Sequence, residues 1–230
     1  MKDAINFSAT FYYTDFILLV TGIIAFVIST LSTNRNKKLY LIPLYLLTSV
    51  LQTLFAFLEL IFPDFFDEVK FSISQLLVSA FILIEYFTIA HVFYEHISSK
   101  KIKLYLKYAS IIYLMIFCGY HLFIKSDRLE MGYFYLIHAT FVLLPPVLFI
   151  FWLFKSEPLF DLINLPPFWI TIGAFICFLG TIPIFLIGRV IFDESSKNLH
   201  LELFAINNIC YTIFFILIIR AIKCTKKMTI

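Results

Sequence analysis

Charged residues are scarce in this chain. Asp, Glu, Lys and Arg make up 14% of its 230 residues, whereas 61% are hydrophobic. A soluble domain of this size needs a polar surface in contact with water, and this composition does not supply one. The sequence therefore predicts a protein whose surroundings are the hydrocarbon of a lipid bilayer.

Glycine and cysteine are also rare, which argues against a phosphate-binding loop and against a disulfide framework. With six glycines and neither a serine-nucleophile nor a dinucleotide motif, a glycine-rich phosphate cradle is not available. Three of the four cysteines, Cys118, Cys177 and Cys210, fall inside apolar segments. We therefore expect single buried thiols rather than disulfides.

Lysine and histidine are missing where two classes of membrane protein need them. No lysine lies between Lys197 and Lys223, which excludes the Schiff base of a retinal protein in the last apolar segment. No histidine follows His200, so the paired histidines of a membrane zinc hydrolase are absent. The sequence therefore favours a protein that is not an enzyme, and it predicts no catalytic residue, no metal site and no cofactor.

Long apolar segments account for most of the chain. A helix needs about 20 residues, at about 1.5 Å each, to cross a bilayer. The sequence predicts an all-α integral membrane protein, a seven-transmembrane-helix bundle that forms a single domain over residues 1–230. The seven spans are Phe11–Leu31, Leu39–Phe62, Phe71–Ile97, Leu104–Ile124, Met131–Leu153, Phe168–Phe192 and His200–Ile222.

The basic residues between these spans predict the orientation, because cytoplasmic connections are enriched in Lys and Arg. One side holds twelve of them: Arg35, Lys37, Lys38, Lys100, Lys101, Lys103, Lys107, Lys155, Arg220, Lys223, Lys226 and Lys227. The other side holds six: Lys2, Lys70, Lys125, Arg128, Arg189 and Lys197. We therefore expect the amino terminus outside and the carboxyl terminus in the cytosol of a cell membrane, typical of a bacterial inner membrane.

Small residues and prolines suggest how the helices pack. The sixth span carries Gly173, Cys177 and Gly180 on one face, which is typical of close helix packing in membranes. Pro145 and Pro146 lie near the middle of the fifth span. Each proline removes a backbone donor, so a kink is expected. Together with Pro183 of the sixth span, they are candidate hinges or cavity walls, or else simply tolerated kinks.

Polar residues at bilayer depth need a partner or a purpose, because burying them in hydrocarbon costs several kcal/mol. We expect these side chains to form an internal polar site, which would bind a ligand or a proton. The alternative is a set of hydrogen bonds that only hold the bundle together. The predicted site residues are Glu85, His138, Asn207 and Asn208, with Gln52 and Arg189 in support.

Two segments near the carboxyl end carry a resemblance. They are Pro166–Gly173, running on to Gly180–Pro183, and Ile206–Tyr211 followed by Arg220–Cys224. They resemble an uncharacterised bacterial multi-pass membrane family, similar to the membrane modules that accompany sensor histidine kinases. The resemblance covers mainly the last two spans, about a quarter of the chain. It implies a sensory or kinase-partner role and supplies no catalytic residue.

Taken together, these observations favour a sensory or regulatory module in the membrane. It would pass a rearrangement of its helices, driven by a ligand or by the membrane, to a cytosolic partner such as a sensor histidine kinase. The lipid bilayer is its other partner, and no nucleic acid is expected. The alternatives are a small-molecule transporter or channel that uses the midplane carboxylate of Glu85, and an intramembrane enzyme with a histidine–carboxylate metal site.

Overall fold

The computed structural model describes the backbone of residues 2–33, 37–61, 70–123, 128–155, 162–190 and 197–225. Side chains are described for most of these residues, apart from several near the ends of the ranges. Within this part of the chain there are seven long helices and no strands. The all-α expectation is therefore confirmed.

Each predicted span corresponds to one helix, with ends that differ by a few residues except at α1, which begins well before Phe11. Two short 3-10 turns, η1 (Lys37–Leu39) and η2 (Leu162–Asn164), precede α2 and α7. Hydropathy marks the part of a helix that lipid can surround, whereas backbone hydrogen bonding continues beyond it. The helices are α1 (Lys2–Thr33), α2 (Ile42–Ile61), α4 (Lys70–His96), α5 (Lys100–Phe123), α6 (Arg128–Lys155), α7 (Pro166–Val190) and α8 (Lys197–Thr225).

Six of these helices contain a segment long and apolar enough to cross a membrane. They are all of the long helices except α2. Among the residues with described side chains, the apolar segment of α2, Ile42–Leu58, is shorter. The chain is therefore a helical bundle built like a multi-pass membrane protein. The seventh crossing, through α2, stays a prediction.

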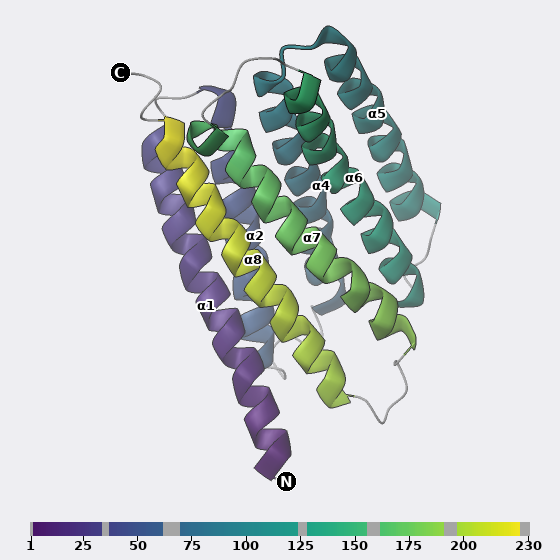
Figure 1. Cartoon of the computed structure of the whole chain (residues 1–230). Coiled ribbons are helices and arrows are strands. Elements are labelled where there is room, and N and C mark those ends of the chain that lie inside the picture. Colours follow the sequence, from purple (N-terminus) through teal and green to yellow (C-terminus); the bar gives the residue numbers. More distant parts are fainter. Residues whose placement is uncertain are drawn as a thin grey trace.

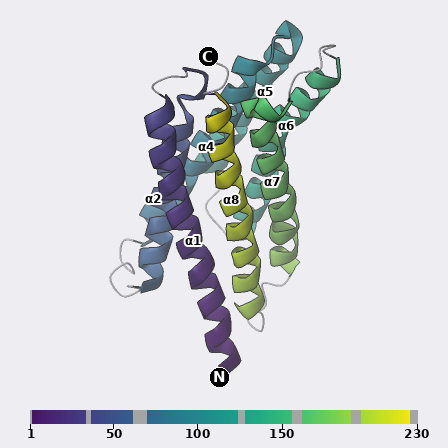
Figure 2. The same ribbon diagram turned by 60° about the vertical axis from the view of Figure 1, so that its left-hand side comes forward.

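Six helices form a ring, and the seventh packs outside it. Around the ring, α1 contacts α2, followed by α4, α6, α7 and α8, and α8 closes the ring against α1. Helix α5 packs on the outside, against α4 and α6 (Figures 1 and 2). The Thr33 end of α1 and the Thr225 end of α8 lie at the same end of the bundle (Figure 1). These two helices thus run in the same direction.

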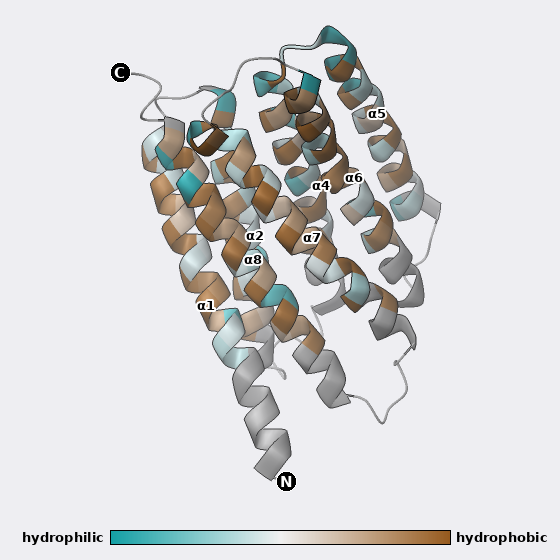
Figure 3. Cartoon of the chain, in the orientation of Figure 1, coloured by the Kyte–Doolittle hydropathy of each residue, from teal (hydrophilic) through white to brown (hydrophobic). Residues whose placement is uncertain are grey.

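Apolar side chains cover much of the outside of the bundle, and ionisable ones lie inside. On α5, Tyr105, Ile111 and Met115 are exposed. By contrast, Glu85 and His138 are buried. Figure 3 shows brown, apolar stretches along much of α1, α7 and α8. Such a distribution suits lipid as the surrounding medium, because acyl chains accept exposed apolar side chains at no cost.

Glycines let α7 and α8 approach closely, as the small residues of the sixth span predict. A Cβ atom at Gly173 would collide with the ring of Phe214. A Cβ atom at Gly180 would lie 2.8 Å from the Cys210 sulfur. Both contacts join α7 to α8, so the predicted packing seam is confirmed.

The prolines lie within helices that continue on both sides of them. Helix α6 runs through Pro145 and Pro146, which are both buried, and α7 runs through Pro183, which is exposed. None of the three is among the described residues that line the cavity below, so the structure does not place them in its wall. Their role as hinges stays a prediction.

Candidate ligand-binding cavity

A cavity of about 290 Å³ lies inside the ring of six helices. All six contribute to its lining, and α5 contributes none of the described lining residues. On α8 the lining runs from Phe204 to Tyr211, within the first half of that helix. The cavity therefore lies towards the end of the bundle where α8 begins.

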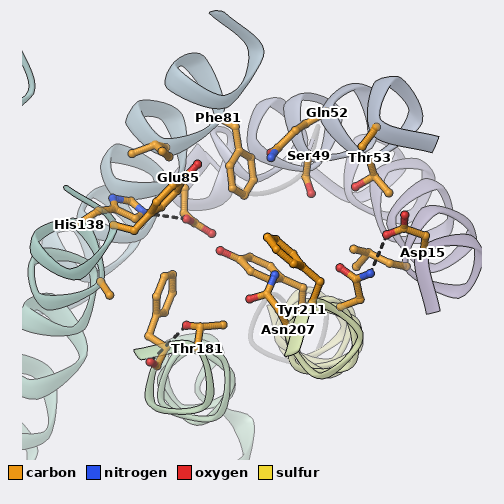
Figure 4. Close-up of a pocket in the computed structure, with 18 residues that line it drawn as sticks. Asp15, Ser49, Gln52, Thr53, Phe81, Glu85, His138, Thr181, Asn207 and Tyr211 are labelled. Carbon is orange, nitrogen blue, oxygen red and sulfur yellow. Dashed lines mark hydrogen bonds and ion pairs between the residues drawn. The ribbon is translucent and has the colours of Figure 1, made fainter. Parts of the chain in front are cut away.

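Glu85 is the centre of a hydrogen-bonded group on one side of the cavity. Its side chain is completely buried near the middle of α4. The hydroxyl of Tyr45, from α2, donates to Oε1 at 2.9 Å. Nε2 of His138, from α6, lies 2.9 Å from Oε2. The side chain of Tyr211, from α8, points towards this carboxylate (Figure 4). Glu85 thus has hydrogen-bond partners on α2 and α6, the two neighbours of α4 in the ring.

His138 extends this group to α5 through its second nitrogen, because the Tyr113 hydroxyl lies 2.8 Å from Nδ1. When the Glu85 carboxylate is ionised it can only accept, so Nε2 of His138 must donate to it. A neutral His138 then accepts from Tyr113 at Nδ1, and a protonated His138 donates there. The Tyr45–Glu85–His138–Tyr113 chain can therefore redistribute a proton without moving any backbone.

Asp15 and Asn208 form a second group, which joins α1 to α8. The amide nitrogen of Asn208 donates to Oδ1 of Asp15 at 2.6 Å. Both side chains are buried. The other carboxylate oxygen, Oδ2, is also buried and has no hydrogen-bond partner among the described residues, and the same holds for Oδ1 of the adjacent Asn207. Figure 4 shows Glu85 and His138 on one side of the cavity and Asp15 on the other.

The structure brings together five of the six predicted site residues. Gln52, Glu85, His138, Asn207 and Asn208 all line the cavity. The sixth, Arg189, lies in the last turn of α7, and its side chain is outside the described residues.

Four participants in the site are not among the six predicted site residues. Asp15 has the polarity expected of a helix near the bilayer surface, and the sequence offers no sign that it meets Asn208. Tyr45, Tyr113 and Tyr211 are three of thirteen tyrosines. Tyr113 and Tyr211 lie at the middle of their predicted spans, away from the interface where tyrosine is common, and this depth is the signal that could have found them. Their contacts with Glu85 and His138 are seen only in the structure.

The lining is acidic and aromatic. It contains the carboxyl groups of Asp15 and Glu85, together with the imidazole of His138, and no Lys or Arg among the described residues. Five aromatic side chains complete the wall: Phe81, Tyr135, Phe178, Phe204 and Tyr211. Across the described residues, no group of three or more His, Cys, Asp or Glu side chains could hold a metal ion. The arrangement suits a small polar ligand or ordered water.

Comparisons with protein-family models, with curated proteins and with solved structures found no match to this chain. The resemblance of the last two spans to membrane modules that accompany sensor histidine kinases therefore stays an expectation.

Proposed function

We propose that this chain is a membrane-embedded sensory module in which a small polar ligand binds in the cavity and shifts α8. The observation that carries the proposal is the pair of buried oxygens without partners, Asp15 Oδ2 and Asn207 Oδ1, in the wall of one cavity. A buried acceptor that lacks a hydrogen bond costs about 1–3 kcal/mol. A ligand that donates to both oxygens would recover that free energy.

Helix α8 connects the cavity to the opposite end of the bundle. Asn207, Asn208 and Tyr211 lie in its first half. Near its end, the Arg220 guanidinium lies 5.4 Å from the centre of the Trp169 ring. The Cys224 thiol donates to the carbonyl of Ile163 in η2 at 3.4 Å. A helix is stiff along its axis, so a shift at the cavity would alter these contacts as well.

The basic connections support the direction of the signal. The end of α8 belongs to the side with more Lys and Arg, which is the side expected in the cytosol. A cytosolic partner, such as a sensor histidine kinase, would then meet the surface formed by η2 and the ends of α7 and α8. The ligand would enter from the outer side.

Trp169 offers a direct test, because the chain has only two tryptophans. In Trp152→Phe protein in lipid nanodiscs, the emission of Trp169 reports on the contact with α8. The probes are a panel of small amines, alcohols, carboxylates and sugars. We expect at least one probe to shift the emission in a saturable way, and Asn208→Ala to abolish that shift. Thr140→Ala, at an exposed position of α6 outside the cavity, is the matched control.

A probe that binds in the cavity while the emission of Trp169 stays constant would contradict the sensory role. A transporter is the second candidate, favoured by the hydrogen-bonded chain around Glu85, which could bind and release a proton. Flux of a probe into proteoliposomes that Glu85→Gln abolishes would replace the sensory proposal with transport.

A further inference from the structure

We infer that the ligand of this cavity is a small organic amine, whose ammonium group binds Asp15 while its apolar part lies against the aromatic wall. This inference rests on the proposed function, because it names the chemical class of the ligand at the same site.

The unpaired oxygens define what the ligand must offer at one end. Asp15 is only 5% exposed, and its Oδ2 has no hydrogen-bond partner among the described residues. Oδ1 of Asn207 is likewise buried and has no hydrogen-bond partner among the described residues. Both atoms can only accept hydrogen bonds when Asp15 is ionised. An ammonium group would donate to Oδ2 of Asp15 and place its charge beside that carboxylate.

The two carboxylates of the cavity are not equivalent. Glu85 already accepts from Tyr45 and contacts His138 and Tyr211, so both of its oxygens are in use. Asp15 has one internal donor, the amide of Asn208. A ligand would have to displace protein hydrogen bonds to reach Glu85, whereas it completes those of Asp15. Asp15 is therefore the anchor.

The rest of the wall suits an organic cation better than an inorganic one. Phe81 and Phe178 flank Tyr211, with ring centres 6.1 and 6.3 Å from that of Tyr211. Aromatic faces attract cations and also pack against alkyl groups. The volume of about 290 Å³ is close to the lower end of small-ligand pockets and far exceeds that of one bare ion. No Lys or Arg lines the described wall, so an anionic ligand has no counter-charge.

The test uses three probes of equal carbon number and different charge at pH 7: n-butylamine, n-butanol and n-butyrate. Binding to the full chain in nanodiscs is measured by calorimetry and by thermal unfolding. We expect saturable binding of n-butylamine that is at least tenfold tighter than that of the other two. Asp15→Asn should weaken it by about tenfold to a hundredfold, the value of a lost charge-assisted hydrogen bond.

Two further variants distinguish a loss of n-butylamine binding from a loss of folding. Phe81→Leu removes an aromatic face of the wall without touching the Asp15–Asn208 contact, so it should also weaken n-butylamine binding even if Asp15→Asn does not fold. Thr140→Ala should leave the binding unchanged.

Three results would overturn the inference. The first is that n-butylamine does not bind at millimolar concentration. The second is that it binds and neither variant weakens the binding. The third is that Na⁺ displaces n-butylamine completely and that the binding of Na⁺ also requires Asp15. If n-butanol or n-butyrate bound instead and moved the emission of Trp169, the amine would be wrong while the sensory function stood. If n-butylamine bound through Asp15 and left Trp169 unaffected, the sensory function would fail while the amine site stood.

Discussion

Oε2 of Glu85 and Nε2 of His138 lie 2.9 Å apart at the centre of the bundle, although 53 positions separate the two residues in the chain. Tyr45 and Tyr113 extend this contact to α2 and α5. Hydrogen bonds of this kind help to hold membrane helices together, because lipid offers polar groups no other partner. The contact therefore defines both the neighbours of α4 and one side of the cavity.

The first prediction concerns His138. His138→Ala leaves Oε2 of Glu85 and the hydroxyl of Tyr113 buried without this partner, so we expect a loss of about 1–3 kcal/mol in the free energy of unfolding. Glu85→Gln should cost less, about 1 kcal/mol, because an amide can accept from Tyr45 and donate to His138. Unfolding by SDS in bicelles measures both. Equal losses in the two variants would contradict this account of the pair.

Tyr45 and Tyr40 form a matched pair for a second prediction. Tyr45→Phe removes the hydroxyl that donates to Glu85 in a fully buried setting, so we expect a loss of about 0.5–1.5 kcal/mol in the free energy of unfolding. Tyr40 is exposed, and Tyr40→Phe should change that quantity by less than about 0.5 kcal/mol. The same SDS titration checks both, and an equal effect of the two variants would argue against a structural role for the Tyr45 hydroxyl.

A third prediction tests the close approach of α7 and α8. Gly173→Ala places a methyl group against Phe214, so we expect a loss of about 1–3 kcal/mol in stability from overpacking. At Gly119, on α5, an added Cβ meets nothing within 4 Å. Gly119→Ala should therefore be neutral or stabilise the helix by up to about 1 kcal/mol. Thermal unfolding in detergent separates the two. If Gly173→Ala left the stability unchanged, the contact between α7 and α8 at this position would be looser than the structure shows.

The fourth prediction concerns the crossing of α2 and the orientation of the chain. In a cysteine-free background, Lys38→Cys should react with an impermeant thiol reagent only from the cytosolic side, and Ile61→Cys only from the outer side. These positions flank α2 at its two ends. Reporter fusions after Ile230 should likewise lie in the cytosol. Labelling of both cysteines from one side would mean that α2 does not cross.

Much of the fold could be predicted from the sequence, because the signal is local. An apolar stretch of about 20 residues dictates a helix in lipid, where every backbone group must be satisfied within its own segment. The seven helices follow the seven apolar stretches for this reason. The depth of a residue along its helix is equally local. Glu85 and Gln52 are therefore expected at similar depth and Asn207 slightly outward of the bilayer centre, and all three line one cavity.

What the sequence determined by itself is the set of helices, their apolar surroundings and the depth of each polar group. Only the tertiary structure decided the order of the helices around the ring and the rotation of each about its axis. Those two choices bring Asp15 to Asn208 across 193 positions and direct three tyrosines towards Glu85 and His138. Both choices depend on how whole helix faces fit together. Hydropathy does not encode that fit, because lipid accepts apolar side chains in every direction around a helix.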